Sequence, residues 1–441
     1  MSNTNTFIIE GGTVIDPLQG INQQKDIFVE DGKVKGLENP GSFSSIDKSV
    51  KRYDAAGQFV APGLVNIHAH LREPGQEWKE DIRSGSQAAV AGGFTTVCCM
   101  PNTEPAIDNA QVVEYIKSKA AAVNLCEILP IGAITKGRKG KELAGMLELH
   151  GAGCVAFSDD GGPVSHAGIM RRALEYSKIF NGVLTVHEEV VELSEGYVMN
   201  ESETSVRLGL KGMPGAAEDI MIARDIELAR LTGGRVHFCH VSTARAVTLI
   251  KRAKEDGINV TAEATPHNFT LDDSYLATYD ANYKMGMPLR SKADVEGILE
   301  GIQSGVIDAI ADDHAPHEDD TKRKEIDIAS FGILGFQSTL PLVLNKVAEG
   351  RFSLMRAIEA LTVSPARCFN LELPTLKVGH KANIVIFDTK LEYDFSRNFI
   401  RSKSKNTPFL NNKFKGGVIN TFYQGREVFS MANHLESIKS V

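Results

Sequence analysis

The chain has 441 residues, of which 42% are apolar and 24% charged, and its net charge is −8. No run approaches the roughly 18 apolar residues of a membrane span, and Met1–Thr6 lacks the features of a secretion signal. We therefore expect a cytoplasmic protein with no membrane contact. Nucleic-acid binding is not expected either, because no Lys/Arg block offers a basic face. The six cysteines show no CxxC spacing, which predicts buried thiols and no disulfides.

The first sixty residues predict short strands joined by turns. Asp31-Gly32 lies between two alternating runs, and this pair favours a type I′ hairpin turn because both positions need a positive φ. Strands are also expected over Lys381–Asp388 and Val418–Tyr423, near the other end of the chain. We therefore predict a small β-sandwich domain built from both chain ends, residues 1–60 and 371–441.

Between these ends, residues 61–370 alternate apolar, strand-like runs with helix-period segments. The runs are Leu64–His70, Thr95–Met100, Glu127–Ile134, Cys154–Ser158, Val183–His187, Arg235–His240, Asn259–Glu263 and Asp308–Asp313. Among the intervening segments, Ala217–Leu231 predicts a helix that leaves Asp225 for water. An open, doubly wound sheet would give the same alternation. The number of runs, and the polar residues that end them, favour a (β/α)8 TIM-type barrel with its site at the carboxyl rim.

Metal-binding side chains end several of these runs. His68 and His70 alternate at strand period, so both imidazoles project to one face and can reach one ion together. His187, His240 and Asp313 each follow an apolar run in the same way. Imidazole and carboxylate are the ligands that zinc prefers when no thiolate is offered. The pattern predicts a zinc site at one rim of the barrel.

Two zinc ions lying close together need an anionic ligand between them, because they carry four positive charges. The fourth run is followed by Asp159 and Asp160, and either carboxylate can supply this bridge. His237 points to the same side of its strand as the histidines at the rim but lies deeper in the barrel, which makes it a weaker ligand candidate.

At these residues the chain resembles the dihydroorotases of the cyclic amidohydrolase group. The matching segments are Pro62–Gly75, Gly92–Thr96, Met100–Thr103, Phe157–Gly161, Thr265–His267 and Asp313–His317. Gly379–Asn383 also resembles part of the C-terminal sheet of that family. The resemblance spans residues 60–370 and thus most of the chain.

The resemblance implies two zinc ions per chain, held by His68, His70, Asp160, His187, His240 and Asp313. In this arrangement Asp160 bridges the ions, and Asp313 also serves as general base and acid. Many relatives bridge the ions with a carboxylated lysine, but the segment Ala156–Asp160 contains no lysine. The match is therefore to the aspartate-bridged dihydroorotases.

The implied reaction is the reversible, zinc-dependent hydrolysis of (S)-dihydroorotate to N-carbamoyl-L-aspartate, a step of de novo pyrimidine (UMP) biosynthesis. The implied substrate contacts are His70, Arg72, Asn102, Gly286, His317, Phe331 and Gly332. Gly286 departs from the family pattern, which commonly has asparagine there, and a hydrogen bond worth about 0.5–1.5 kcal/mol would be absent. The charged segment Glu318–Ile328 predicts either a mobile loop over the site or an ordinary surface loop.

Two other functions are compatible with parts of this pattern. One is another cyclic amidohydrolase, such as a dihydropyrimidinase (hydantoinase) or an allantoinase; Arg72 and the missing lysine argue against it. The other is a non-catalytic dihydroorotase-like subunit of aspartate transcarbamoylase, which the retention of all six ligands argues against. The resemblance also favours a homodimer and an association with aspartate transcarbamoylase.

Overall fold

The computed structural model describes residues 5–439 and contains the predicted parallel barrel. Its strands are β6 (Leu64–Ala69), β7 (Phe94–Cys99), β8 (Glu127–Pro130) continued by β9 (Gly132–Ala133), β10 (Phe157–Ser158), β11 (Val183–Val186), β14 (Arg235–Phe238), β15 (Val260–Ala264) and β16 (Ala309–Ile310). Neighbouring strands pair in parallel from β6 to β8 and from β9 to β16. The ring closes where Ala69 pairs with His314 and where the amide of His70 donates to the carbonyl of His314 at 2.8 Å.

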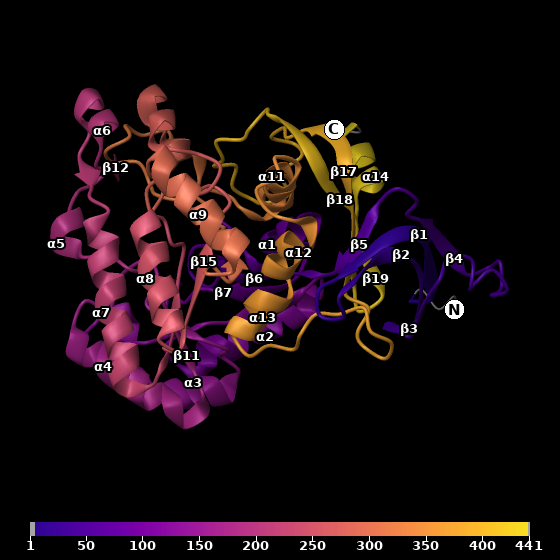
Figure 1. Ribbon diagram of the computed structural model, residues 1–441, viewed down its shortest axis with the longest axis horizontal. Coiled ribbons are helices and arrows are strands. Elements are labelled where there is room, and N and C mark those ends of the chain that lie inside the picture. The colour runs from indigo at the N-terminus through magenta and orange to yellow at the C-terminus, as the bar shows by residue number, and fades with distance from the viewer. Residues whose placement is uncertain (1–4, 440–441) are drawn as a thin grey trace.

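Helices follow the barrel strands and cover them from outside (Figure 1). Those of the barrel are α1 (Ile82–Ala91), α2 (Ala110–Val123), α3 (Met146–Ala152), α4 (Ala167–Ser177), α5 (Val191–Ser194), α6 (Glu203–Leu208), α7 (Ala216–Thr232), α8 (Ala244–Glu255), α9 (Lys292–Ser304), α10 (Asp319–Lys322), α11 (Phe336–Ala348), α12 (Leu354–Leu361) and α13 (Val363–Cys368). Short strands β12 (Met199–Asn200) and β13 (Gly212–Met213) pair beside α6.

The predicted helix over residues 217–231 is α7, but the predicted exposure of Asp225 is wrong. Asp225 is fully buried, and the Arg224 guanidinium donates to its carboxylate at 2.7 Å from Nε and 2.9 Å from Nη2. A buried carboxylate is tolerated where a cation pairs with it and satisfies its oxygens. Ile220, on the same helix, is 53% exposed although it is apolar.

Both chain ends contribute strands to a second sheet, which lies beside the barrel in Figure 1. Its strands are β1 (Phe7–Asp16), β2 (Ile21–Glu30), β3 (Lys33–Glu38), β4 (Lys51–Asp54), β5 (Phe59–Pro62), β17 (Ile384–Asp394), β18 (Lys413–Tyr423) and β19 (Arg426–Ser430), with α14 (Met431–Lys439) following. Asp31 and Gly32 form the predicted turn with φ of 52° and 73°. Ile384 and Ile386 pack into the core of this sheet, whereas Val385 and Phe387 between and after them pack into the main core.

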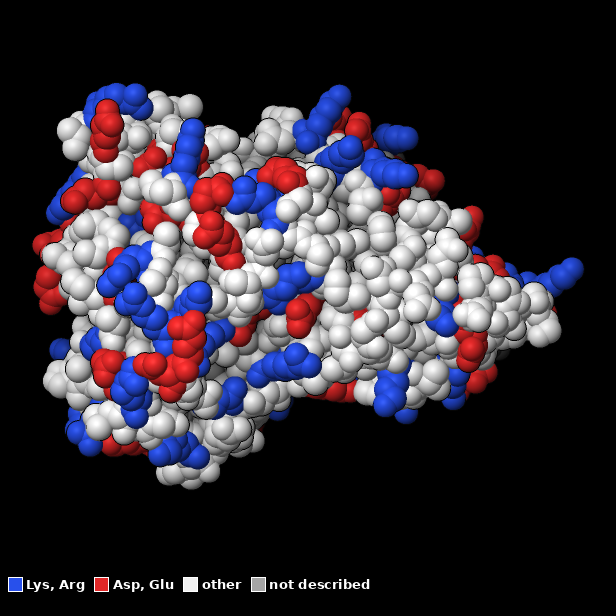
Figure 2. Space-filling view, viewed as in Figure 1, with Lys and Arg blue, Asp and Glu red and all other residues white. Residues whose placement is uncertain are grey.

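Acidic and basic residues are interspersed over the barrel helices on the face shown in Figure 2. None of the helices within residues 5–439 combines the length and apolar character that a bilayer crossing requires. All six cysteines are buried and unpaired, which confirms the sequence prediction.

Helix α1 ends in close contact with the start of α11, and Gly92 makes this contact possible. A Cβ atom at Gly92 would lie 2.1 Å from the carbonyl oxygen of Phe336. Because this oxygen belongs to the backbone, it can shift only at a large energetic cost. We expect Gly92→Ala to lower the free energy of unfolding by about 1–3 kcal/mol, the usual cost of overpacking. The matched control is Gly151→Ala in α3, where an added Cβ meets no heavy atom within 4 Å. Denaturant unfolding measures both variants, and a wild-type midpoint for Gly92→Ala would contradict the packing argument.

Candidate metal centre

The predicted metal ligands meet at the carboxyl rim of the barrel although they are far apart in sequence. Each is carried at or just beyond the end of a barrel strand: His68 and His70 by β6, Asp160 by β10, His187 by β11, His240 by β14 and Asp313 by β16. This convergence follows from the parallel barrel, because the carboxyl ends of all its strands form one ring.

Asp160 lies at the centre of the cluster and divides its two oxygens between two pairs of histidines. Oδ2 is 3.7 Å from His68 Nε2 and 3.5 Å from His70 Nε2. Oδ1 is 3.5 Å from His187 Nδ1 and 3.4 Å from His240 Nε2. One carboxylate therefore faces two separate sets of imidazole nitrogens, the arrangement that a bridging ligand requires.

The neighbouring Asp159 bonds to the loop after β9 and not to the histidines. Its Oδ1 accepts hydrogen bonds at 3.0 Å from the backbone amides of both Ile134 and Thr135, and its Oδ2 accepts one from the Thr135 hydroxyl. These bonds hold the loop after β9. Of the two aspartates that the sequence offered as a bridge, Asp160 is the one that faces the histidines.

Asp313 joins the first histidine pair from the opposite side. Its Oδ1 lies 2.9 Å from His70 Nε2 and 3.4 Å from His68 Nε2. The Asp313 side chain is 17% exposed, against 3% for Asp160 and 0% for His68. Asp313 is therefore the carboxylate of the cluster that is most accessible to a molecule entering from solvent.

The outer nitrogens of the first histidine pair are held by side chains from neighbouring strands. His68 Nδ1 lies 2.5 Å from Glu263 Oε1, and His70 Nδ1 lies 2.8 Å from Asn102 Oδ1. Acceptors at these positions favour the tautomers that leave both Nε2 atoms free for a metal. Glu263, whose other oxygen lies 3.1 Å from His237 Nε2, had no predicted role, although it ends the seventh strand-like run. His237 is thus a partner of Glu263 below the cluster.

The cluster fits a divalent cation by the chemistry of its donors. His68 Nε2 is buried and has no hydrogen-bond partner among the described residues, although it faces two carboxylates. The ligand atoms of His68, Asp160 and His240 lie within 4.8 Å of one another, and so do those of His68, His70 and Asp313. Burial alone would raise the pKa of Asp160, but the charge on His68 and hydrogen bonds from His187 and His240 hold it well below its usual range.

The backbone at this rim is strained at three predicted site residues. Arg72, His240 and Asp313 have φ values of 62°, 33° and 45°, in the region that side-chain-bearing residues rarely adopt. Such conformations persist only where surrounding contacts fix them, and they are frequent at functional sites.

A pocket of about 320 Å³ opens above the cluster. Its lining comprises His70, Arg72, Asn102, Asp160, Gly161, His187, Glu189, Tyr197, His240, Gly286, Asp313, Ala315, His317, Phe331 and Gly332. Every predicted site residue except His68 lines this pocket, and His68 is fully buried. Glu189 and Tyr197 had no predicted role. Glu189 lies 3.1 Å from His187 Nε2, and its position two residues after that histidine was the available signal.

One wall of the pocket is cationic. Arg72 is only 7% exposed; its Nε donates to the Pro316 carbonyl at 3.2 Å, and its Nη2 lies 3.2 Å from His317 Nε2. Burial and the adjacent Arg72 lower the pKa of His317 to about 2, so the neutral ring accepts the Arg72 hydrogen bond. Together with the nearby Asn102, this wall offers donors to an anionic group.

Another part of the lining contains Gly286, Phe331 and Gly332. The Tyr197 hydroxyl donates to the Gly286 carbonyl, and the rings of Tyr197 and Phe331 lie 4.9 Å apart. A Cβ atom at Gly286 would meet no heavy atom within 4 Å, so this position leaves the pocket open. The segment predicted as a mobile loop contains α10, and the ammonium of Lys322 in α10 donates to the carbonyls of Ser330 and Gly332. Its mobility stays a prediction.

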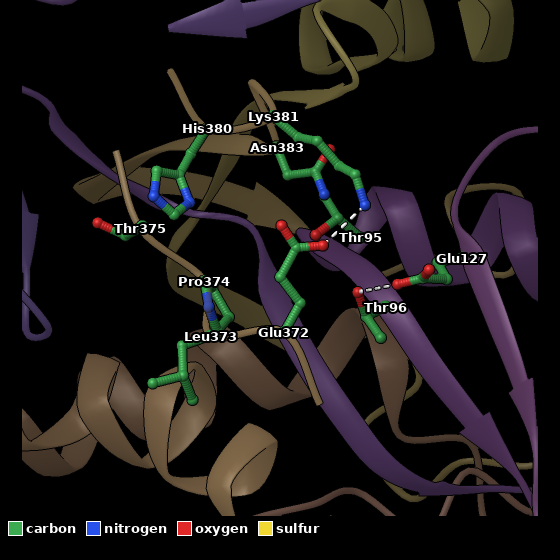
Figure 3. Close-up of a pocket in the computed structure, with 10 residues that line it drawn as sticks. All are labelled: Thr95, Thr96, Glu127, Glu372, Leu373, Pro374, Thr375, His380, Lys381 and Asn383. Atoms are coloured by element: carbon green, nitrogen blue, oxygen red, sulfur yellow. Dashed lines mark hydrogen bonds and ion pairs between the residues drawn. The ribbon is translucent and has the colours of Figure 1, made fainter. Parts of the chain in front are cut away.

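A second, smaller hollow of about 40 Å³ lies where β7 and β8 begin, at the other end of the barrel (Figure 3). There Lys381 pairs with Glu372 at 2.8 Å, and the Thr96 hydroxyl donates to Glu127 at 3.4 Å. No predicted site residue lines this hollow. Of the two hollows, as formed by the described residues, only the pocket at the carboxyl rim is lined by predicted metal ligands.

Solved structures with the same fold include an L-hydantoinase (dihydropyrimidinase) from Arthrobacter aurescens. Its TM-score is 0.86 at 25% identity, and the match covers 96% of each chain. A dihydropyrimidinase from Brevibacillus agri NCHU1002 matches with a TM-score of 0.83 at 21% identity, over 96% of this chain and 95% of that one. These likenesses confirm the barrel with a β-sandwich built from both chain ends.

Proteins similar in sequence identify the family more closely than the shared fold does. The family model for dihydro-orotase-like proteins matches residues 57–246. A dihydroorotase from Endomicrobium trichonymphae is 48% identical over 420 residues, 95% of this chain and 98% of the relative. A dihydroorotase from Geobacter sp. (strain M21) is 46% identical over 423 residues, 96% of this chain and 99% of the relative. The chain therefore belongs to the dihydroorotase family.

Proposed function

We propose that the protein is a dihydroorotase that binds two zinc ions and reversibly hydrolyses (S)-dihydroorotate to N-carbamoyl-L-aspartate. The observation that carries the choice of substrate is the buried Arg72 guanidinium, which faces the same pocket as the metal cluster. A cyclic amide without a carboxylate would give this buried guanidinium no anionic partner, at a cost in binding.

His68, His70 and Asp313 would hold one ion, His187 and His240 the other, and Asp160 would contact both. Zinc bound in this way supplies an activated water at neutral pH and polarises a carbonyl oxygen. Glu263 and Asn102 hold the His68 and His70 rings in the orientation that this binding needs.

Asp313 carries the proton in this proposal. The oxygen of one water bonds to the ring carbonyl carbon, the ring C–N bond breaks, and the nitrogen gains a hydrogen. Asp313 accepts the proton that the water loses and donates it to the leaving nitrogen, as its access to the pocket permits. In the direction of ring closure the same carboxylate takes the proton from nitrogen.

Arg72 orients the substrate by its free carboxylate, with Asn102 and His317 beside it. A guanidinium can form two parallel hydrogen bonds to a carboxylate, and these fix the ring relative to Asp313 and the histidines. Phe331 and Gly332 also line the pocket; because the Gly332 amide and carbonyl are bonded to other protein groups, Phe331 would offer the backbone contact to the ring amides.

A substrate panel tests the proposal. Purified protein loaded with zinc is assayed with dihydroorotate, dihydrouracil and hydantoin, and its metal content is determined by elemental analysis. We expect turnover of dihydroorotate alone and two zinc ions per chain. Preferential turnover of hydantoin or dihydrouracil would assign the protein to the dihydropyrimidinases, and no turnover of any of the three would support a non-catalytic subunit.

Arg72→Lys probes the carboxylate contact within the same assay. Lysine keeps the charge but cannot form the paired hydrogen bonds, and loss of a charged hydrogen bond worth about 1.5–3 kcal/mol raises KM about 10- to 150-fold. The matched control is Arg83→Lys on the exposed side of α1, which should leave KM unchanged. An unchanged KM for Arg72→Lys would contradict the assigned contact. Homodimer formation and association with aspartate transcarbamoylase stay predictions of the family resemblance.

A further inference from the structure

A segment of the small domain crosses the barrel rim and contacts the loops that form the pocket. We call residues 400–407, between β17 and β18, the crossing segment. Ser402 Oγ and the amide of Lys403 donate to the fully buried carboxylate of Glu80, and Ser404 Oγ donates to the Lys79 carbonyl at 2.6 Å. These bonds fix the crossing segment on the loop that follows β6.

Asn406, in the same segment, bonds to two other loops at once. Its Nδ2 donates to the carbonyl of Ala315 at 2.9 Å and to the carbonyl of Gly332 at 3.1 Å. Its Oδ1 accepts from the backbone amide of His317 at 3.0 Å, and its own carbonyl accepts from the Leu334 amide at 2.9 Å. Asn406 is 3% exposed, so water does not compete for these bonds.

The two loops approach each other closely at this point. A Cβ atom at Gly332 would lie 2.6 Å from Ala315 Cβ, and Gly332 has a φ of +107°, which side-chain-bearing residues rarely adopt. Asn406 is the side-chain donor to the Ala315 carbonyl, and it shares the Gly332 carbonyl with the Lys322 ammonium, which lies 3.0 Å from that oxygen. Without the Asn406 amide the Ala315 oxygen would lose its side-chain donor and the Gly332 oxygen would keep only Lys322; leaving a buried acceptor unsatisfied costs about 1–3 kcal/mol.

The loops so joined both carry predicted substrate contacts that line the pocket. His317 lies on the cationic wall beside Arg72, and Gly332 lies on the wall formed with Phe331. Gly332 is fixed further by its amide, which donates to the Lys284 carbonyl at 2.9 Å. Backbone pairing joins the two loops at one point, where the Ala315 amide donates to the Ile333 carbonyl at 2.8 Å, and Asn406 adds bonds to the His317 amide and the Gly332 carbonyl, nearer the substrate contacts.

We propose that Asn406 is a positioning residue for substrate binding: it fixes the distance between the His317 loop and the Phe331–Gly332 loop. This inference rests on the proposed function, because it assumes that these loops bind dihydroorotate. Asn406 does not line the pocket, and its hydrogen bonds go to Ala315, His317, Gly332 and Leu334 and not to the proposed metal ligands. It should therefore act on substrate affinity and leave the metal cluster intact.

Asn406→Asp tests this with nearly unchanged side-chain volume. The aspartate keeps an acceptor for the His317 amide but loses both donors and places a negative charge against two carbonyl oxygens. The matched control is Ser404→Ala, which removes one buried hydrogen bond of the same crossing segment and leaves both pocket loops bonded. The measurements are KM and kcat for dihydroorotate, thermal stability and zinc content.

We expect Asn406→Asp to raise KM at least tenfold, with kcat within threefold of wild type and unchanged zinc content. Ser404→Ala should lower thermal stability but keep KM within twofold. Equal KM values for the two variants, or a loss of kcat with unchanged KM, would overturn the inference. If wild type and Ser404→Ala both fail to turn over dihydroorotate, the proposed function itself is wrong.

Hydrogen exchange on the wild-type protein gives a readout that needs no variant. The His317 amide, bonded to Asn406 Oδ1, should exchange slowly in the folded protein without substrate. Fast exchange of this amide under native conditions would overturn the inference even if Asn406→Asp does not fold.

Discussion

Asp313→Asn is expected to lower kcat for dihydroorotate by about 10²–10⁴-fold, the usual contribution of a general acid–base group. The amide has the same shape as the carboxylate but cannot take a proton from water or return it to the ring nitrogen. Because Asp313 also faces His68 and His70, zinc binding is measured separately, and kcat is determined at saturating zinc.

The control for this prediction is Asp320→Asn, the same replacement at an exposed position of α10 near the pocket mouth. It changes the net charge equally and should leave kcat and zinc content at wild-type values. A zinc-saturated Asp313→Asn variant with wild-type kcat would remove Asp313 from proton transfer and restrict it to metal binding.

Asp160→Asn is expected to release metal and abolish turnover together. The carboxylate faces all four histidines, and its replacement by a neutral amide removes the charge that two adjacent cations require. We expect zinc content to fall below one ion per chain. We also expect kcat to fall at least about 10³-fold, because several kcal/mol of metal-derived stabilisation are lost.

Asp159→Asn separates this effect from the loss of a buried charge in general. Asp159 is buried and adjacent in sequence, but it bonds the backbone of Ile134 and Thr135. The variant should lose about 1–3 kcal/mol of stability through a weakened set of hydrogen bonds and keep its zinc. If elemental analysis found Asp160→Asn fully loaded and Asp159→Asn depleted, the bridge would have been assigned to the wrong aspartate.

The sequence could predict the barrel and the cluster because both depend on local patterns. Apolar runs of strand length mark β6 to β16, and in a parallel barrel the residue that ends each run must lie at the common rim. His187 and His240 could be placed near His68 on that ground alone. The resemblance then distinguished Asp160 from Asp159, a choice that the spacing of the two residues left open.

Other features depend on contacts that no local pattern records. Asp225 has the character of a surface residue and is buried only because Arg224 turns back onto it. Glu263 ends its strand among apolar residues, and its contact with His68 spans 195 positions of sequence. Asn406 bonds loops 74 to 91 positions away. Such partners become visible only when the loops are placed in space.

The seam where Ala69 pairs with His314 joins the first barrel strand to the last at the rim that carries the cluster. His70 and Asp313, which flank this seam, are 243 positions apart, so their encounter requires the closure of a very long loop. A nascent chain that ends before Asp313 lacks a donor of the first ion site. Acquisition of metal during synthesis should therefore be a late event that accompanies ring closure, and zinc uptake can serve as a kinetic reporter of that last folding step.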